Sequence, residues 1–225
     1  MKILIVAATY SELKPLLEKA VIIEKIDDCF SHYRIDEKET DVMITGIGMV
    51  STAYHMGRIL GKYKYDFAFN FGIAGSFDKN ISTGTVVNID SDVLSELGAE
   101  NGNEFLKFDQ LGMGASSISK TLWKGKNNFE IYSPVIQQLQ RVKGITVNSV
   151  HGNNDSIKKV YNLFIPDVES MEGAAFLAIC NAEKIKCAQI RSISNYVEER
   201  KKDNWEIEKA IKSLNDIAIR ILNSI

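Results

Sequence analysis

The chain has 225 residues, of which 45% are hydrophobic and 25% charged, and its formal net charge at pH 7 is −2. This composition is that of an ordinary globular protein, and it indicates neither a nucleic-acid nor a membrane partner. The length suits one sizeable α/β domain and is short for two domains with separate cores, so we expect a single domain over residues 1–225.

The cysteines and the first residues bear on the cellular compartment. Cys29, Cys180 and Cys187 are an odd number of cysteines at spacings that match neither a disulfide framework nor a metal-binding knuckle. The apolar run in MKILIVAATYSELK is short for a signal peptide and lacks a clean small-residue cleavage site. We therefore expect a first strand here and a reducing, cytoplasmic location.

Short apolar runs that lead into glycine-containing turns recur along the chain and predict buried strands. In chain order they are KILIVAAT, DVMITGIG, DFAFNFGIAG, GTVVNI, GITVNSVHG and KCAQIRSIS. Helical patterns cover ELKPLLEKA, MVSTAYHMGRILGKY, SPVIQQLQRV, SMEGAAFLAICNAEKI and an amphipathic stripe from Ile207 to Leu222. This alternation predicts a three-layer αβα fold with helices on both faces of a sheet. The less regular segment from Asp90 to Asn128 is expected to form loops that cover a site.

Polar or glycine-rich residues follow five of the predicted strands, where ligands bind in α/β sheets. They are Glu12, TGIG at 45–48, GIAGS at 72–76, HGNND at 151–155, and Ser194 with Asn195. The glycine turns either present backbone N–H groups to a ligand and let it approach closely, or are only tight strand-to-helix turns. Their spacing does not match the dinucleotide fingerprint.

Two carboxylates stand in VESMEGAAF at 168–176. Negative charge is favourable near a helix N-terminus, which explains Glu169 but not Glu172, because an apolar helix follows Glu172 directly. An unpaired buried carboxylate is costly, so we expect Glu172 to have a partner such as the hydroxyls of a sugar.

The histidines do not form a metal-binding pattern. His32, His55 and His151 are widely spread and show no H-x-x-H or H-E-x-x-H spacing, so we expect no metal site. His55 lies inside a predicted helix, which favours a structural role. His151 ends a predicted strand beside Gly152, and a substrate-binding role and a structural role both remain open.

Together these motifs resemble the nucleoside phosphorylases and nucleosidases of the purine and uridine phosphorylase superfamily. The resemblance spans nearly the whole chain and rests on Glu12, TGIG, NFGIAGS at 70–76, ESMEGAAF at 169–176 and RSISN at 191–195. It implies a nucleoside phosphorylase-like fold with a central mixed sheet, a small-molecule nucleoside substrate, no cofactor, and a homo-oligomer of two or more subunits.

Within the superfamily, SMEGAAF combined with SISNYVEERKKDNW resembles the futalosine hydrolases, enzymes of menaquinone biosynthesis. The adenosylhomocysteine nucleosidases carry an aspartate in place of Asn195. The resemblance implies that Glu12 activates water and that Glu172 holds the ribose hydroxyls. The other substrate contacts that we expect are Met171, Ser194, Ile47, Gly75, His151 and Phe105.

The substrate assignment depends on Asn195. A 6-oxopurine presents two acceptors, O6 and N7, to which a carboxamide can donate, whereas an aspartate complements the donor and acceptor of a 6-aminopurine. We therefore expect Asn195 to bind the base and Ser194 to orient the amide, with hypoxanthine as the leaving group. The alternative is that Asn195 only caps the strand end or turns the chain.

The choice of nucleophile follows from the arginines, because phosphorolysis needs cations to hold phosphate. None of the six arginines lies in AATYSEL or NFGIAGSFD, the stretches that line the phosphate pocket of the relatives. This predicts water as the nucleophile, although Arg34 reaching a neighbouring subunit would keep phosphorolysis open. Phe105 and Phe108 are candidates to line a pocket for the aromatic 5′ arm of futalosine. A methylthioadenosine/adenosylhomocysteine-type nucleosidase and a non-catalytic binding protein on the same fold remain alternatives.

Overall fold

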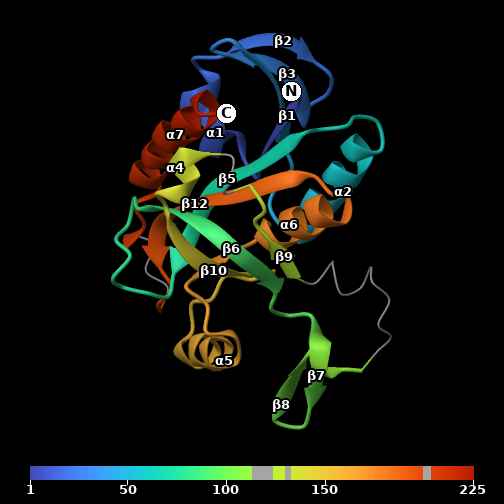
Figure 1. The fold of residues 1–225 in the computed structure, drawn as a ribbon. Helices are drawn as coiled ribbons and strands as arrows, with labels where there is room; N and C mark the ends of the chain where they lie inside the picture. The colour runs from blue at the N-terminus through green and yellow to red at the C-terminus, as the bar shows by residue number, and fades with distance from the viewer. Residues whose placement is uncertain (113–123, 130–132, 200–203) are drawn as a thin grey trace.

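A central sheet of ten strands organises the molecule (Figure 1). The computed structural model describes residues 1–112, 124–129, 133–199 and 204–225. The strands of the sheet are β1 (Ile3–Ala7), β2 (Val21–Lys25), β3 (Phe30–Ile35), β4 (Lys38–Ile44), β5 (Phe67–Ser76), β6 (Val86–Leu94), β9 (Lys124–Lys126), β10 (Gln140–Thr146), β11 (Val168–Ser170) and β12 (Lys186–Tyr196). Their order is β11-β10-β6-β12-β5-β1-β4-β3-β2, with β9 beside β6. Parallel and antiparallel pairs both occur, so the sheet is mixed as expected.

One end of the sheet closes on itself. Strand β11 pairs with β10 in parallel and with β5 antiparallel, so β5, β12, β6, β10 and β11 form a ring of paired strands. The ring brings β11 next to the carboxyl ends of β5 and β12, which are far from it in sequence. This closure positions the candidate site described below.

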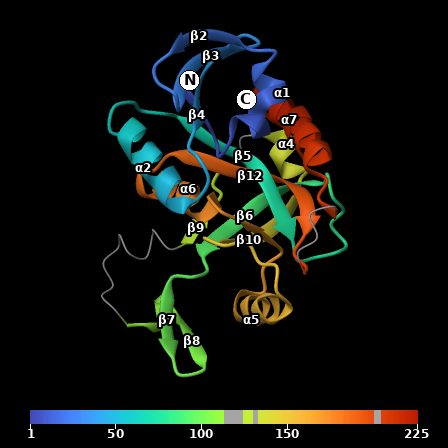
Figure 2. The same ribbon diagram turned by 180° about the vertical axis from the view of Figure 1, so that it is seen from behind.

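Helices cover both faces of the sheet, as predicted (Figures 1 and 2). Those on one face are α1 (Tyr10–Leu17), α4 (Pro134–Gln137) and α7 (Ile207–Asn223), and those on the other are α2 (Met49–Leu60) and α6 (Gly173–Ala182). Alternation along β1 supplies both cores: Ile3 and Ile5 pack in the cluster of α1 and α7, whereas Leu4 and Val6 pack in the cluster of α2 and α6.

Several predicted boundaries were wrong. The helix expected over 133–142 ends at Gln137, because Gln140–Thr146 pairs with β6 and β11 as strand β10. The stretch GIAGS at 72–76 is not a turn but the end of β5, which pairs with β12 throughout and with β11 at Gly75 and Ser76. Part of the expected loop segment forms a hairpin of β7 (Gly98–Asn101) and β8 (Glu104–Lys107), followed by a 3-10 turn, Phe108–Gln110.

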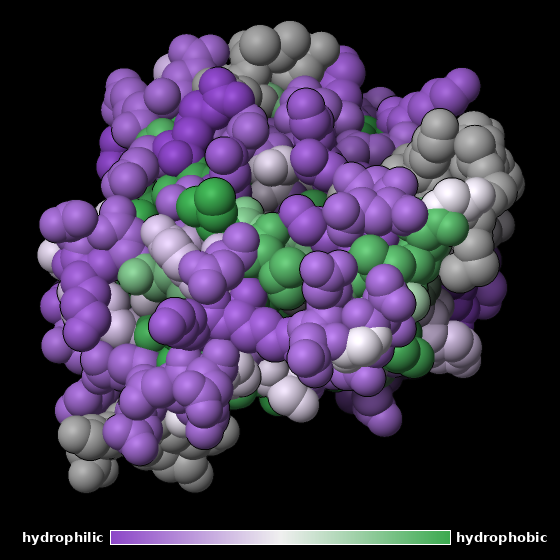
Figure 3. Space-filling model, turned by 90° about the horizontal axis from the view of Figure 1, so that it is seen from below, coloured by the Kyte–Doolittle hydropathy of each residue, from purple (hydrophilic) through white to green (hydrophobic). Residues whose placement is uncertain are grey.

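The remaining helix, α5 (Asn154–Phe164), and the β7–β8 hairpin lie at one end of the molecule. Seen from this end, the surface is mostly hydrophilic, with a band of hydrophobic residues across its middle (Figure 3). Residues 113–123 of the expected loop segment and 200–203 of the charged run fall outside the described residues. In the described parts of the chain, no helix is both long and apolar enough to span a membrane.

Candidate active site

Glu12 is buried three residues into α1, where the local sequence fixes its carboxylate. Its Oε2 accepts hydrogen bonds from the backbone N–H and the hydroxyl of Thr9, at 2.8 and 3.1 Å, in a capping box. Its Oε1 accepts from the N–H of Ile73 in β5 at 3.1 Å. Burial raises the pKa of Glu12 above its ordinary value, and the charge of Arg191 partly offsets this effect. The carboxylate is therefore held rigidly and is partly desolvated.

Arg191 is the residue of this site that our sequence analysis missed. It lies within β12, fully buried, and its Nη2 donates to Oδ1 of Asn70 and lies 3.9 Å from Oε2 of Glu172. Among the described residues, Nε and Nη1 have no hydrogen-bond partner. A buried guanidinium is tolerated only beside opposite charge, and Glu12 and Glu172 supply it. A charged residue in the middle of a strand predicted to be buried was the signal in the sequence.

Glu172 is the N-cap residue of α6 and is buried. Its Oε1 accepts a hydrogen bond of 2.9 Å from the N–H of Gly48, so the TGIG turn faces a carboxylate of the chain itself. The turn requires glycine at two positions, because φ is +79° at Gly46 and +100° at Gly48. Ile47 between them is 63% exposed. Glu172 therefore has partners within the chain itself, a backbone amide and an arginine, in addition to any ligand.

The three charged side chains form one cluster with a defined chemical capacity. Two carboxylates and one guanidinium leave a net negative charge, which favours a cation and opposes phosphate. A carboxylate with a raised pKa can accept a proton from water. The cluster therefore suits attack by water on a centre that develops positive charge.

Asn195 lies at the carboxyl end of β12, just after an irregularity in the strand. The pairing of β12 with β5 shifts register between Ile193 and Asn195, so Ser194 is an extra residue that redirects the strand end. The hydroxyl of Ser194 donates to Oδ1 of Asn195 at 2.7 Å, and Nδ2 donates to the carbonyl of Tyr196 at 3.0 Å. Ser194 thus orients the amide, as expected, and among the described residues Nδ2 makes only this one hydrogen bond, so its second N–H has no partner there.

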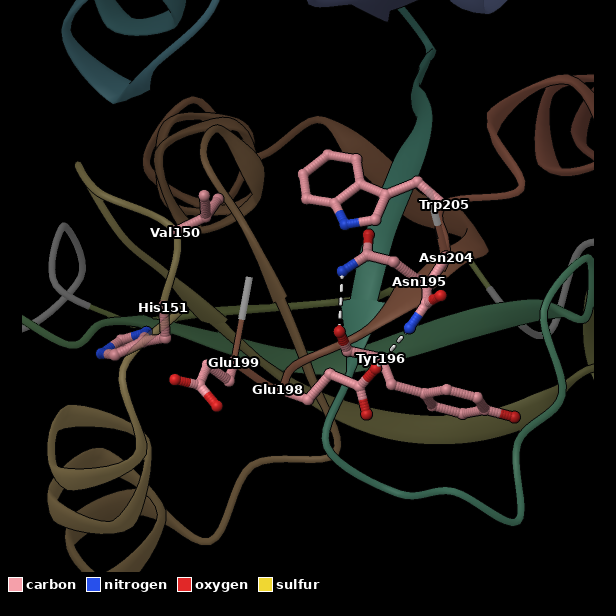
Figure 4. A pocket seen from close by; sticks show the side chains of 8 residues that line it. All are labelled: Val150, His151, Asn195, Tyr196, Glu198, Glu199, Asn204 and Trp205. Atoms are coloured by element: carbon pink, nitrogen blue, oxygen red, sulfur yellow. Dashed lines mark hydrogen bonds between the residues drawn. The ribbon is translucent and has the colours of Figure 1, made fainter. Parts of the chain in front are cut away.

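A small pocket adjoins this amide. Figure 4 shows Asn195 and the indole of Trp205 on one side and His151 with Glu199 on the other. The lining residues are Val150, His151, Asn195, Tyr196, Glu198, Glu199, Asn204 and Trp205.

His151 is bound to Glu169, which our sequence analysis explained wrongly. Glu169 belongs to β11 and not to the first turn of α6, so the helix dipole does not account for it. Its Oε1 accepts from the backbone N–H of His151 at 3.0 Å, and its Oε2 lies 2.7 Å from Nδ1 of the ring.

The other expected substrate contacts lie around this region. Phe105 lines a second pocket that also contains His151 and includes Lys159 and Phe164. Met171 is partly buried against the cluster of Ile145, Val147 and Val160. Gly75 lies in β5 beside Asn195. Among the described residues, no group of three or more His, Cys, Asp or Glu side chains could hold a metal ion.

Comparisons with known proteins place this geometry in a family. The chain is 27% identical to a futalosine hydrolase from Thermus thermophilus over 79% of each chain. It is 28% identical to a 5′-methylthioadenosine/S-adenosylhomocysteine nucleosidase from Maridesulfovibrio salexigens, over 88% of this chain and 87% of the relative. A solved structure of such a nucleosidase from Streptococcus pneumoniae, in complex with 8-aminoadenine, aligns over 100% of both chains with a TM-score of 0.82 and 21% identity.

These comparisons confirm the predicted fold class and the predicted enzyme class, an N-glycosidase. The relatives are named for different substrates, futalosine in one case and 5′-methylthioadenosine or S-adenosylhomocysteine in the other. The family model described as the Phosphorylase superfamily matches residues 2–224. The chain therefore belongs to the phosphorylase superfamily, as its motifs predict.

Proposed function

We propose that this protein hydrolyses the N-glycosidic bond of futalosine and releases hypoxanthine, as a step of menaquinone biosynthesis. The observation that carries the proposal is the carboxamide of Asn195, held by Ser194 at the strand end. The likeness to the futalosine hydrolase of Thermus thermophilus supports it. The resemblance further leads us to propose a cytoplasmic homo-oligomer.

Cleavage of this bond builds positive charge on the ribose and negative charge on the departing base. In the proposed mechanism, Glu12 takes a proton from the attacking water, since its carboxylate is fixed and its pKa is raised. Glu172 accepts hydrogen bonds from the ribose hydroxyls, and its charge stabilises the developing cation. Arg191 lies 3.9 Å from Glu172, and its positive charge favours the ionised form of Glu12.

Asn195 acts on the leaving group. Because its Oδ1 accepts from Ser194, its Nδ2 is directed to donate, and O6 and N7 of a 6-oxopurine are acceptors. An amide does not release a proton at neutral pH. The residue therefore stabilises negative charge on the purine by hydrogen bonding, which suits hypoxanthine better than adenine.

Two other activities remain candidates for this site. The relative from Maridesulfovibrio salexigens favours a 5′-methylthioadenosine/S-adenosylhomocysteine nucleosidase. Arg191 is a buried cation that favours a 6-oxopurine nucleoside phosphorylase, but its two carboxylate neighbours oppose the binding of phosphate.

The decisive experiment compares four substrates: futalosine, aminofutalosine, inosine and methylthioadenosine, each with and without phosphate. Free base is followed by chromatography. The proposal expects hypoxanthine from futalosine at a rate that does not depend on phosphate. Release that requires phosphate would establish phosphorolysis, and preferred release of adenine would establish the 6-aminopurine activity.

A further inference from the structure

Strands β9, β6 and β10 turn one face toward α6. On this face, Asp92 of β6 is the register partner of Gly125 in β9 and of Gly144 in β10. A β-carbon built on Gly125 would lie 2.2 Å from the side chain of Leu177 in α6, so the helix closes this face. Because side chains alternate along a strand, the residues before and after these three point to the opposite face.

The opposite face carries lysines beside apolar side chains. Lys124 of β9 and Ile145 of β10 are the register partners of Val93 in β6, and Lys143 of β10 is the partner of Ser91 in β6. Ile145 is buried, whereas both lysines are exposed. The three strands therefore place two ammonium groups and one hydroxyl around an apolar floor.

Two further segments enclose this face as a recess of about 210 Å³. They are the β7–β8 hairpin and the end of α5, which lie beyond the ends of β6 and β10 (Figure 1). The hairpin supplies Lys107, whose Nζ lies 5.3 Å from the centre of the Phe164 ring at the end of α5. The recess is therefore lined by lysines from three different strands, β8, β9 and β10.

The recess is positively charged, although the whole chain carries a net charge of −2. Its lining contains three lysines and one acidic residue, Asp109. In the described parts of the chain, none of the three lysines has an ion-pair partner. Asp167 lies close by, where it accepts a hydrogen bond of 2.7 Å from the backbone N–H of Lys143, and the local charge stays positive when Asp167 is included. Positive charge above an apolar floor concentrates the electrostatic field and attracts anions.

The lining matches an anion with several negative charges. Each ammonium group donates up to three hydrogen bonds and acts as a point charge, and the hydroxyl of Ser91 is a further donor. A carboxylate carries one charge and would leave most of this positive charge uncompensated. The volume is smaller than the roughly 300–1,000 Å³ of pockets that hold drug-sized ligands, so a compact group is favoured. A diphosphate group is compact and multiply charged.

We propose that this recess is an anion-binding site, in which Lys107, Lys124, Lys143 and Ser91 bind a diphosphate group. The site is separate from the candidate active site, and the inference does not depend on the proposed function. The diphosphate is either free or part of a nucleotide, since both present the same oxygens. A competing explanation is that the lysines form an ordinary solvated surface without a specific ligand.

The test measures dissociation constants of inorganic pyrophosphate and of cytidine 5′-diphosphate by calorimetric titration of the whole chain. A pyrimidine nucleotide is used because the proposed active site takes purines. The site variant is Lys124→Gln with Lys143→Gln. The matched control is Lys62→Gln with Lys64→Gln, which removes the same charge from two exposed lysines outside the recess. Circular dichroism checks the folding of each protein.

We expect wild-type protein to bind at least one of the two probes, more tightly at low than at physiological ionic strength. The site variant should bind about 25-fold more weakly, which is about fivefold for each lysine, and the control should keep wild-type affinity. Tighter binding of pyrophosphate would identify a free diphosphate as the ligand, and tighter binding of the nucleotide would identify a nucleoside diphosphate.

Three results would overturn the inference. One is a dissociation constant weaker than about 1 mM for both probes. Another is an equal loss of affinity in the site variant and in the control, which would show that general surface charge attracts the anions. The last is binding of a short single-stranded RNA at these lysines by a protein that binds neither probe, which would make the recess part of a nucleic-acid surface. Neither probe is a purine nucleoside, so the outcome is independent of whether the protein cleaves futalosine.

Discussion

Nη1 of Arg191 lies directly against the backbone of Gly72. A β-carbon built on Gly72 would lie 1.8 Å from Nη1 and 3.0 Å from Oε1 of Glu12. The absence of a side chain at this one position in β5 therefore leaves room for the arginine of β12 and the carboxylate of α1 on the same side of Gly72.

The first prediction is that Gly72→Ala displaces both side chains. Overpacking in a rigid core costs about 1–3 kcal/mol of unfolding free energy. Misplacing a reacting group by about 1 Å can lower the rate about 100-fold, so we expect a comparable fall in kcat/KM. Both quantities are measured, by urea denaturation and by base release.

Gly57→Ala is the matched control for this substitution. Gly57 is an exposed residue of α2, and nothing lies within 4 Å of its β-carbon position. Alanine there should raise the unfolding free energy by about 0.5–1 kcal/mol and leave kcat/KM unchanged. If Gly72→Ala also kept the wild-type kcat/KM, the close approach of Arg191 to Gly72 would not be needed for activity.

A second prediction concerns Glu12 and pH. Burial raises the pKa of Glu12 above 4.5, and a base must be unprotonated to act, so kcat/KM should fall as the pH drops through that raised value. Glu12→Gln should lower kcat by about 10²–10⁴-fold and remove this acidic limb from the residual activity. A pH profile of both proteins checks the prediction, and a variant that keeps the limb would show that another group titrates there.

The strands most readily predicted from the sequence were those whose apolar runs are buried on both faces. β1, β5 and β12 have this character, and each was placed correctly to within two residues or less at its start. The edge strand β2 was missed because all five of its residues are exposed, although three of them are apolar. Strand β2 is held by its backbone pairing with β3, and the hydrophobic pattern of its own residues does not indicate this pairing.

Residues of the candidate site could be predicted where they belong to a local sequence motif. They could not be predicted where only the tertiary structure brings them into the site. Glu12 and Asn195 were predicted from motifs that follow strands, and Glu172 from a motif at the start of a helix; the structure shows all three buried or half-buried, and their roles stay predictions. Arg191 was missed because the search for cations covered only AATYSEL and NFGIAGSFD, whereas parallel pairing of β12 with β5 brings Arg191 next to Gly72 from another part of the chain. Glu169 was misread because helix-terminus electrostatics is a local rule, and its partner His151 comes from another segment.

A third prediction is that Asn195→Asp changes the choice of base. The substitution removes the NH₂ donor that we propose binds O6 and N7, and leaves an acceptor or a titratable acid in its place. An unsatisfied buried polar group costs roughly 1–3 kcal/mol, so kcat/KM for futalosine relative to aminofutalosine should fall by about 5- to 150-fold. Competition between the two substrates in one reaction measures this ratio directly, and an unchanged ratio would remove Asn195 from base recognition.

The fourth prediction concerns Asp92, a fully buried carboxylate next to the N-terminus of α6. Its oxygens accept hydrogen bonds from Thr146 at 3.0 Å and from Gln189 at 3.1 Å, and a β-carbon on Gly173 would lie 2.4 Å from Oδ2. Burial nevertheless raises the pKa of Asp92 from 3.8 to about 6. The folded protein therefore binds this proton more tightly than the unfolded chain does.

The stabilisation from this proton is fully present below pH 3.8 and is lost as the pH rises through about 6. Asp92→Asn removes the titration and keeps a side chain that can accept from Thr146. The unfolding free energy of the variant relative to the wild type should therefore increase by about 2 kcal/mol between about pH 4 and pH 7.5. Urea denaturation of both proteins across this range measures the difference, and a difference that stayed constant would mean that Asp92 does not titrate there.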